Sequence, residues 1–202
     1  MLRAVVFDVG NVIVDWNVRA FYARFITDPA RLDWFLANVV TPDWHFQHDM
    51  GRPFADTSAE LIARFPAEAD LIRLFGPRFN ETIVGPIPGM IELVEQLAAR
   101  GVPLFAITNF AQEFWLQFRP EWPVFDHFID IVVSGAERLA KPDPAIYQLA
   151  LRRFGLAPGE AIFIDDRADN VAAAQANGFA GHLFEGAAGL NAELVRLGLL
   201  PQ

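Results

Sequence analysis

Three short apolar segments of this chain each end in polar side chains, and this repeated pattern limits the folds open to it. The segments are AVVFD ending at Asp8, VPLFAITN ending at Thr108 and Asn109, and AIFIDD ending at Asp165 and Asp166. Each is too short for a helix and is bounded by turn-forming residues, which predicts strands buried on both faces. Two further segments, FIDIVVS over 128–134 and AGHLFE over 180–185, follow the same pattern.

Helical patterns fill the intervals between these strands. They cover residues 90–100, 112–118, 144–154 and 169–178. Gly101 and Gly155 follow two of them and are typical helix stops. Strands that alternate with helices at such intervals indicate βαβ units. The sequence therefore predicts an α/β fold with a doubly wound, Rossmann-like parallel sheet.

The first strand does not continue directly into this series. Residues from about 17 to 85 lack the alternation and show helical pieces instead, such as VRAFYARFI and ARLDWFLANVV. A plain connection of this length is uncommon inside a compact domain. We expect a small helical subdomain over 16–85, inserted into a catalytic core made of 1–15 and 86–202.

Composition narrows the class of protein further. Hydrophobic residues make up 53% of the 202 residues and charged residues 20%, which is typical of a compact globule. The absence of cysteine excludes disulfides and thiolate catalysis and suits a reducing interior. A net charge of −9 disfavours nucleic acid as a partner but leaves small phosphorylated substrates open.

Targeting signals are also not expected. Charges at Arg3 and Asp8 leave no room for the apolar core of a signal peptide. No segment approaches the roughly 18 consecutive apolar residues of a membrane-spanning helix. We expect a cytoplasmic protein with no membrane partner.

The polar strand ends predict a common site. Ligands of open parallel sheets bind outside the carboxyl ends of the strands, and neighbouring strands lie about 4.8 Å apart. Asp8, Asp165 and Asp166 would then meet at one edge, where like charges repel. A divalent cation relieves this repulsion, and Mg²⁺ prefers carboxylate and carbonyl oxygens. The sequence thus predicts a Mg²⁺ site from the whole set, although Asp8 taken alone is better explained by a strand-end turn.

Each side chain of this set has a natural chemical role. Asp8 can attack phosphorus and form an aspartyl-phosphate that water later hydrolyses. Thr108 and Asn109 can donate hydrogen bonds to phosphoryl oxygens, and Lys141 can neutralise their charge. The chain has 15 arginines and only this one lysine, which fits a site that needs a compact point charge and equally fits a codon bias with one chance exception.

These residues resemble the motifs of the haloacid dehalogenase-like hydrolases. FDVGNVIVD, FAITN, AKPDPAIY and FIDDRADNV match the four motifs in order, over residues 1–15 and about 86–185. The inserted helices resemble the cap of that family. Within the family, the sequence is most similar to the sugar-phosphate phosphatase branch, which includes α-glucose-1-phosphate phosphatase. The resemblance implies that Asp8 is the nucleophile and that Thr108 and Lys141 hold phosphate. It also implies that Asp166 binds Mg²⁺ with Asp165 nearby and the Gly10 carbonyl as a further ligand.

One position departs from the family pattern. Most phosphatases of this family carry a second Asp two residues after the nucleophile, where it serves as general acid and base, and here that position is Gly10. Three explanations are open: a substrate with a good leaving group, a proton donor elsewhere, or chemistry other than phosphoryl transfer. The candidate donors are Asp15, His48 and Asp49. A phosphatase of the same branch also has glycine here, which favours the first two explanations.

The departure keeps two alternatives to a phosphatase open. The dehalogenases of the family also lack the second Asp, use no metal, and displace halide from carbon, so a 2-haloacid dehalogenase would use the same nucleophile. Their first loop typically reads Tyr-Gly-Thr, whereas this one reads Val-Gly-Asn. The pair Asp165–Asp166 also favours a metal. A non-catalytic binder of phosphorylated ligands is the second alternative, supported by Gly10 alone.

The segment TPDWHFQHDMGRPF (41–54) is the most unusual part of the insert. On a helix, His45, His48 and Asp49 share one face. They could enter a cleft between insert and core, where His48 would bind substrate and help to exclude water. A solvent-exposed helix face and a zinc site are the alternatives. The expected partner is a small phosphorylated metabolite such as a sugar phosphate.

Overall fold

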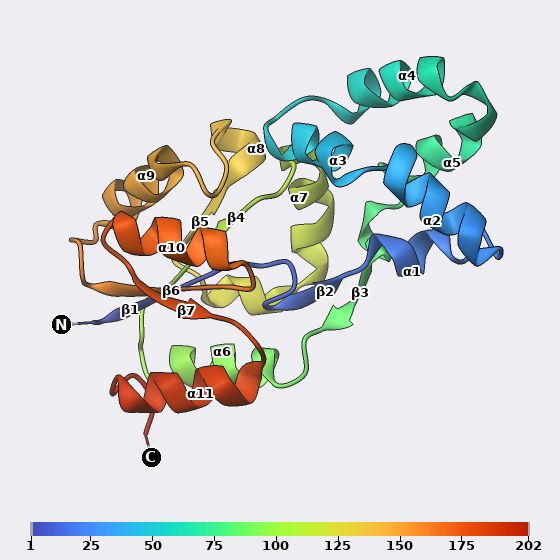
Figure 1. Cartoon of the computed structure of the whole chain (residues 1–202). Coiled ribbons are helices and arrows are strands. Elements are labelled where there is room, and N and C mark those ends of the chain that lie inside the picture. The colour runs from blue at the N-terminus through green and yellow to red at the C-terminus, as the bar shows by residue number, and fades with distance from the viewer. Residues whose placement is uncertain (1, 202) are drawn as a thin grey trace.

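The core of the molecule is a parallel five-stranded sheet. The computed structural model describes residues 2–201, and in it the strands lie in the order β5-β4-β1-β6-β7. Their bounds are β1 Ala4–Phe7, β4 Leu104–Thr108, β5 Asp130–Val133, β6 Ala161–Asp165 and β7 Ala180–Leu183. The central strand β1 pairs in parallel with both β4 and β6, which aligns the ends of these three strands. Figure 1 shows this sheet with helices on either side.

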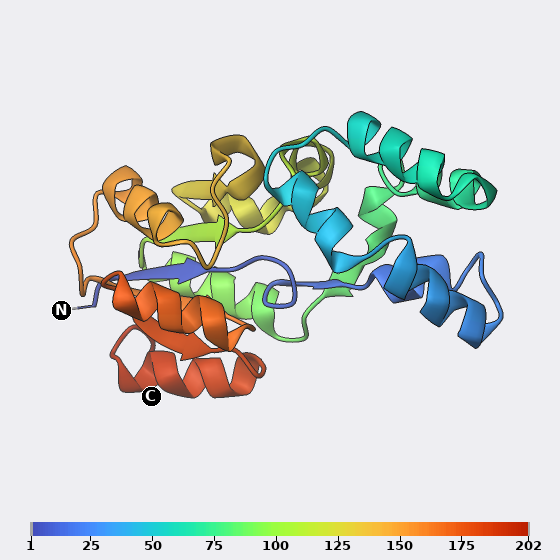
Figure 2. The same cartoon turned by 45° about the horizontal axis from the view of Figure 1, so that its top comes forward.

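Helices cover both faces of the sheet. Helices α9 (Pro144–Phe154) and α10 (Ala168–Ala176) lie on one face, and α6 (Met90–Ala99) and α11 (Ala187–Arg196) lie on the other (Figures 1 and 2). The strands fit this arrangement because successive side chains point to opposite faces. Val5 of β1 belongs to the hydrophobic cluster with α6 and α11, whereas Val6 belongs to the cluster with α9 and α10. Both faces of β1 are therefore buried.

The insert between β1 and β4 is mainly helical. Its elements are α1 Val18–Tyr22, α2 Pro29–Asn38, α3 Pro42–Asp49, α4 Phe54–Arg64, η1 Pro66–Glu68, α5 Ala69–Leu74 and η2 Phe79–Thr82. Aromatic rings form its interior; Phe75, for example, packs against Tyr22, Trp44 and Phe79. An antiparallel ribbon, β2 (Val14–Trp16) with β3 (Ile83–Pro86), carries the chain into the insert and back.

The predicted α/β fold with an inserted helical part is confirmed. All five predicted strands and the four predicted helices are present, with α7 at Gln112–Phe118. The sequence analysis missed α11, the short α8 (Ser134–Glu137), the ribbon, and the 3-10 turns η3 (Arg119–Glu121) and η4 (Pro123–His127). The ribbon crosses both boundaries expected between core and insert, so the division into 1–15, 16–85 and 86–202 stays a prediction. Within the described residues, no helix has the length and apolar character needed to cross a bilayer.

Candidate active site

A buried lysine joins two aspartates at the carboxyl ends of the central strands. The Nζ atom of Lys141 lies 2.8 Å from Oδ2 of Asp8 and 2.7 Å from Oδ2 of Asp165. Asp8 directly follows β1, and Asp165 is the last residue of β6, so the parallel pairing of these strands brings the two carboxylates together. Only 2% of Lys141 is exposed. The ammonium therefore pairs with both carboxylates in an environment that excludes most water.

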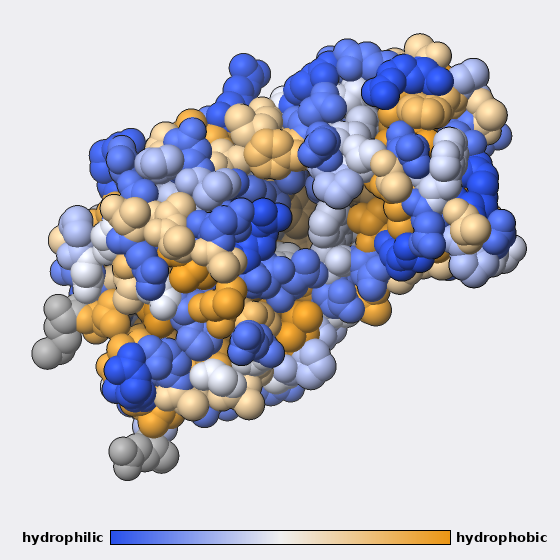
Figure 3. All heavy atoms as spheres, viewed as in Figure 1, coloured by the Kyte–Doolittle hydropathy of each residue, from blue (hydrophilic) through white to orange (hydrophobic). Residues whose placement is uncertain are grey.

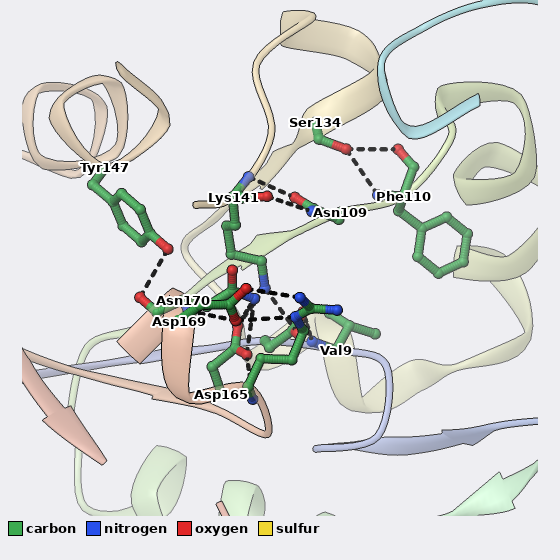
Figure 4. Close-up of polar contacts among 11 residues, drawn as sticks. Val9, Asn109, Phe110, Ser134, Lys141, Tyr147, Asp165, Asp169 and Asn170 are labelled. Carbon is green, nitrogen blue, oxygen red and sulfur yellow. Dashed lines mark hydrogen bonds and ion pairs between the residues drawn. The ribbon is translucent and has the colours of Figure 1, made fainter. Parts of the chain in front are cut away.

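Hydrogen bonds from α10 hold Asp165 in place. The side-chain amide of Asn170 donates to both carboxylate oxygens of Asp165, at 3.0 and 3.1 Å, and the backbone N–H of Arg167 donates at 2.9 Å. The hydroxyl of Tyr147 donates in turn to the carbonyl of Asn170 at 2.9 Å. Figure 4 shows these contacts around Asp165. Because its oxygens are already engaged, Asp165 is suited to fixing the position of Lys141.

The loop that carries Lys141 is tied to the end of β4. Asn109 and Lys141 form a reciprocal pair: the Lys141 N–H donates to Oδ1 of Asn109 at 2.8 Å, and Nδ2 of Asn109 donates to the Lys141 carbonyl at 3.0 Å (Figure 4). Two residues further on, Asp143 caps α9 by accepting from the Ala145 N–H, and Pro144 occupies the first turn of that helix. The loop is thus fixed at both ends.

Burial and charge shift the acid–base properties of these groups. Burial raises the pKa of Asp8 to about 7; the nearby ammonium of Lys141 opposes this shift, and the charge of Asp165 adds to it. Burial alone would lower the pKa of Lys141, but its two carboxylate partners raise it above the ordinary value. Burial, with the charge of Asp165, also raises the pKa of Asp166. Three carboxyl groups therefore compete for one buried positive charge.

The same three carboxylates are arranged to hold a cation. One oxygen from each of Asp8, Asp165 and Asp166 can be chosen so that all three lie within 4.8 Å of one another. A hard divalent ion takes oxygen ligands in this range of separations, and its charge would offset the repulsion between the acids. Gly10 lines the adjoining cavity, so the first loop also reaches this position. The donor set fits Mg²⁺.

A cavity of about 490 Å³ opens in front of these residues, between core and insert. Figure 3 shows the surface hollowed between the two parts of the molecule. Asp8, Lys141 and Asp166 line its core side. Much of the remaining lining is apolar: Trp16, Pro42, Phe46, Phe79, Ile83 and Phe110. A cavity of this size accommodates a small organic molecule.

Most of the predicted site residues meet at this cavity. Asp8, Gly10, Asn109, Lys141 and Asp166 line it, and Asp165 contacts Lys141 from behind. Thr108 does not line it. It is the last residue of β4, and only 1% of it is exposed. The roles assigned to all of these residues stay predictions.

Two of the three polar residues of α3 that were expected at the cleft line the cavity, and the third does not. His48 was expected to bind substrate, but it does not line the cavity: it is fully buried, and its Nε2 lies 2.6 Å from the Thr57 hydroxyl inside the insert. The rings of Trp44, Phe54 and Phe114 pack around its imidazole, and a role of His48 in substrate binding stays a prediction. Its helix neighbours His45 and Asp49 do line the cavity.

Sequence reasoning gave no role to Asn170, Arg167, Asn11 or Trp16. Asn170 lies within the motif FIDDRADNV, and its spacing of five residues from Asp165 places it on the first turn of α10, facing the strand end. That spacing is a local signal that could have identified it. Trp16 gives no such signal, since it reaches the cavity only through the β2–β3 ribbon.

Comparison with proteins of known sequence supports a family assignment. The haloacid dehalogenase-like hydrolase family matches residues 2–178. The chain is 29% identical over 188 residues to the sesquiterpene phosphatase astK of Aspergillus oryzae, covering 89% of this chain and 88% of that protein. It is also 29% identical to the mouse acyl-CoA dehydrogenase family member 10, a much longer protein of which it covers only 17%.

Solved structures share the fold at low sequence identity. The enzyme BT-2542 of Bacteroides thetaiotaomicron, crystallised with magnesium and inorganic phosphate, matches with a TM-score of 0.71 and 18% identity, covering 93% of this chain and 96% of that one. The L-2-haloacid dehalogenase of Xanthobacter autotrophicus, with chloropropionic acid covalently bound, matches with a TM-score of 0.64 and 20% identity, covering 100% and 85%.

The family match thus covers nearly the whole chain, in agreement with the order of the four motifs and with the meeting of Asp8, Lys141 and Asp165 at one sheet edge. This protein belongs to the haloacid dehalogenase-like hydrolase family.

Proposed function

We propose that this protein is a Mg²⁺-dependent phosphatase that hydrolyses the phosphate monoester of a small cytoplasmic metabolite. One observation carries the proposal: the carboxylate of Asp8 lines the cavity between core and insert, beside the only lysine of the chain, and one of its oxygens lies within 4.8 Å of an oxygen of each of two further carboxylates. A nucleophile, a fixed cation and an acidic metal-binding set are what the transfer of a phosphoryl dianion to a carboxylate requires.

Each residue of the site has its own role in the proposed reaction. Asp8 attacks the phosphorus atom, forming a bond from its carboxylate oxygen while the ester bond to the leaving oxygen breaks. Lys141 offsets the charge of the transferred group, and Asn109 keeps that lysine's loop in position. Bound Mg²⁺, held by Asp8, Asp166 and the Gly10 carbonyl with Asp165 behind them, would shield the incoming dianion from the carboxylates. Water then cleaves the aspartyl-phosphate and restores Asp8.

The cavity walls favour a substrate whose organic part is largely apolar. Aromatic side chains such as Trp16, Phe46 and Phe110 offer contact area but few hydrogen-bond partners. Sugar hydroxyl groups that faced this apolar wall would lack hydrogen-bond partners, and buried unpaired polar groups are costly. The similarity to a protein named as a sesquiterpene phosphatase points the same way. We therefore place phosphates of isoprenoid or aromatic alcohols ahead of the sugar phosphates expected from sequence.

A 2-haloacid dehalogenase is the second candidate, because Gly10 provides no carboxyl group near the nucleophile and a dehalogenase shares the fold. Displacement of halide from carbon needs no proton donor and no metal. The clustering of Asp165 and Asp166 around Asp8 argues against it, because a metal-free site would have to tolerate three uncompensated acids beside one lysine.

One experiment separates the candidates. The purified protein is incubated with Mg²⁺ and, in turn, with farnesyl monophosphate, phenyl phosphate, glucose 1-phosphate, phosphoglycolate and 2-chloropropionate, and the release of phosphate or chloride is measured. We expect phosphate release that is fastest with the apolar esters and absent in Asp8→Asn. Chloride release without phosphate release would establish the dehalogenase instead, and binding of beryllium fluoride without turnover of any compound would indicate a non-catalytic binder.

A further inference from the structure

A leaving alkoxide needs a proton, and neither Lys141 nor Gly10 can supply it. Lys141 is positively charged, but both of its carboxylate partners hold that proton firmly. Gly10, in the first loop, has no side chain to contribute. An ester of an ordinary alcohol leaves slowly unless its oxygen is protonated as the bond breaks, and such assistance is typically worth about 10² to 10⁴ in rate.

Asp49 of the insert is the acid that reaches the cavity from the opposite side. It is the last residue of α3, only 5% of it is exposed, and it lines the same cavity as Asp8. Its Oδ1 atom is buried without a hydrogen-bond partner, the nearest basic atom being Nε2 of His45 at 3.7 Å. A buried carboxyl oxygen that is left unpaired next to a substrate cavity is costly unless a ligand contacts it.

We propose that Asp49 is the general acid and base of this enzyme, supplied by the insert in place of the position occupied by Gly10. The assignment rests on the proposed phosphatase function. In the first step the Asp8–phosphorus bond forms, the ester bond breaks, and the proton of the Asp49 carboxyl moves to the leaving oxygen, giving the alcohol. In the second step water attacks phosphorus, its proton moves to the Asp49 carboxylate, and the Asp8–phosphorus bond breaks to release phosphate.

The surroundings of Asp49 favour the protonated form of its carboxyl group, which is the form needed when the ester bond breaks. Burial raises the pKa of Asp49 to about 8, the charge of Asp8 adds to this shift, and the ammonium of Lys141 and the N–H of Ala111 oppose it. The position at the end of a helix acts in the same direction, since the partial negative charge there disfavours a carboxylate. An acid that is protonated near neutral pH and can give up its proton in the transition state suits this role.

The other candidate groups are less suitable. Burial lowers the pKa of His45 to about 3, so its ring is neutral and has no proton to release as an acid. His48 is enclosed in the insert, and Asp15 does not line the cavity. Asp43 does line it, but this residue is exposed to solvent, and its position in the first turn of α3 is at the opposite end of the helix from Asp49.

The test compares leaving groups in Asp49→Asn, which keeps the size of the side chain but cannot transfer a proton. With phenyl and alkyl phosphates, whose leaving oxygens need a proton, we expect turnover to fall by about 10² to 10⁴. With p-nitrophenyl phosphate, a much better leaving group, the first release of nitrophenol should remain rapid. Phosphorylated Asp8 should then accumulate and be detected by mass spectrometry of acid-quenched enzyme, because the base that activates water is missing.

A compensating substitution sharpens the test. A side chain at Gly10 has room, since a Cβ there meets nothing closer than the Cβ of Trp16 at 4.0 Å. Gly10→Asp introduced into Asp49→Asn should restore at least tenfold of the lost turnover of alkyl phosphates. The control is Asp56→Asn, which removes an exposed acid of the insert that does not line the cavity and should behave as wild type.

The outcomes separate the two proposals. An active wild-type enzyme whose Asp49→Asn variant loses the same factor with every leaving group, and accumulates no phosphorylated Asp8, would overturn the role of Asp49 alone. A wild-type protein that releases no phosphate from any ester would overturn the proposed function.

Discussion

The ammonium of Lys141 lies between Asp8 and Asp165, 2.8 Å from one carboxylate and 2.7 Å from the other. Asp165 accepts three further hydrogen bonds from Asn170 and Arg167, whereas Asp8 accepts one more, from the N–H of Val9 at 2.7 Å. Asp165 is thus the anchoring partner, and Asp8 is the one that faces the cavity. The lysine thus joins a carboxylate held in the interior to one that lines the cavity.

The first prediction concerns this lysine. Lys141→Arg keeps the positive charge, but a planar guanidinium is larger than an ammonium and cannot place one point charge between two carboxylates. We expect kcat/KM for phosphate esters to fall by about 10² or more, a loss of the size seen when one stabilising donor is removed from an active site. Steady-state kinetics and circular dichroism of both proteins measure this. Rates equal to wild type would contradict the importance of the compact charge.

The control for this variant is Arg64→Lys, which makes the reverse exchange at an exposed position of α4 and should leave kcat/KM unchanged. If both variants lost activity equally, the loss in Lys141→Arg could not be attributed to geometry at the site.

The second prediction concerns the metal. Removal of divalent ions with EDTA should abolish phosphate release, because the buried ammonium of Lys141 offsets only part of the charge of the clustered carboxylates of Asp8, Asp165 and Asp166. Mg²⁺ added in excess should restore it. Isothermal titration of the metal-free protein should show one binding site that is lost in Asp166→Asn. Undiminished hydrolysis in the chelator would contradict the metal-dependent mechanism.

The core was predictable from sequence because its signals are local. Short apolar runs such as 161–165 end in acids, and helical spacing fills the gaps, so the strand ends and their chemistry follow from the pattern. The meeting of Asp8 with Asp165 also followed, because the ends of parallel strands meet at a single edge. Lys141 lies in a loop between two helices, and only the family resemblance indicated that it would join them. The regular alternation of strands and helices is thus enough to predict the core.

The insert was less predictable because its geometry depends on tertiary packing. His48 and Asp49 are adjacent in sequence and equally polar, yet one is enclosed by aromatic rings and the other faces the cavity. Which face of α3 turns inward is decided by its contacts with α4 and α8 from distant parts of the chain, and a short helix with few apolar residues gives no periodic signal for it.

The third prediction concerns stability and pH in the metal-free protein. An ordinary Asp has a pKa of about 3.9 in an unfolded chain. In the folded protein, burial raises the pKa of Asp49 to about 8. Between these values the folded state holds a proton that the unfolded state has lost. The stabilising contribution is therefore complete below about pH 4 and is lost as the pH rises toward 8.

Asp49→Asn removes this titration, so its free energy of unfolding should fall less steeply than that of wild type as the pH rises. The difference in slope has an upper bound of about 1.4 kcal/mol per pH unit for one proton. Urea unfolding in EDTA at a series of pH values from 5 to 8.5 measures it. Parallel curves for the two proteins would contradict a raised pKa at Asp49, and Asp56→Asn serves again as the control.

The last prediction concerns the apolar wall of the cavity. Phe46 lines the cavity, yet 43% of it is exposed, so it contributes little to the folded core and is available to a ligand. Phe46→Ala should raise KM for farnesyl monophosphate by about tenfold, since covering an aromatic side chain is worth roughly 1.5 to 3 kcal/mol. Because the contact is made equally in the ground state and the transition state, kcat should stay close to wild type. The thermal midpoint should change little, and Trp34→Ala, which removes an equally exposed aromatic of the insert that does not line the cavity, should leave KM unchanged. An unchanged KM in Phe46→Ala would mean that the organic part of the substrate does not contact this wall.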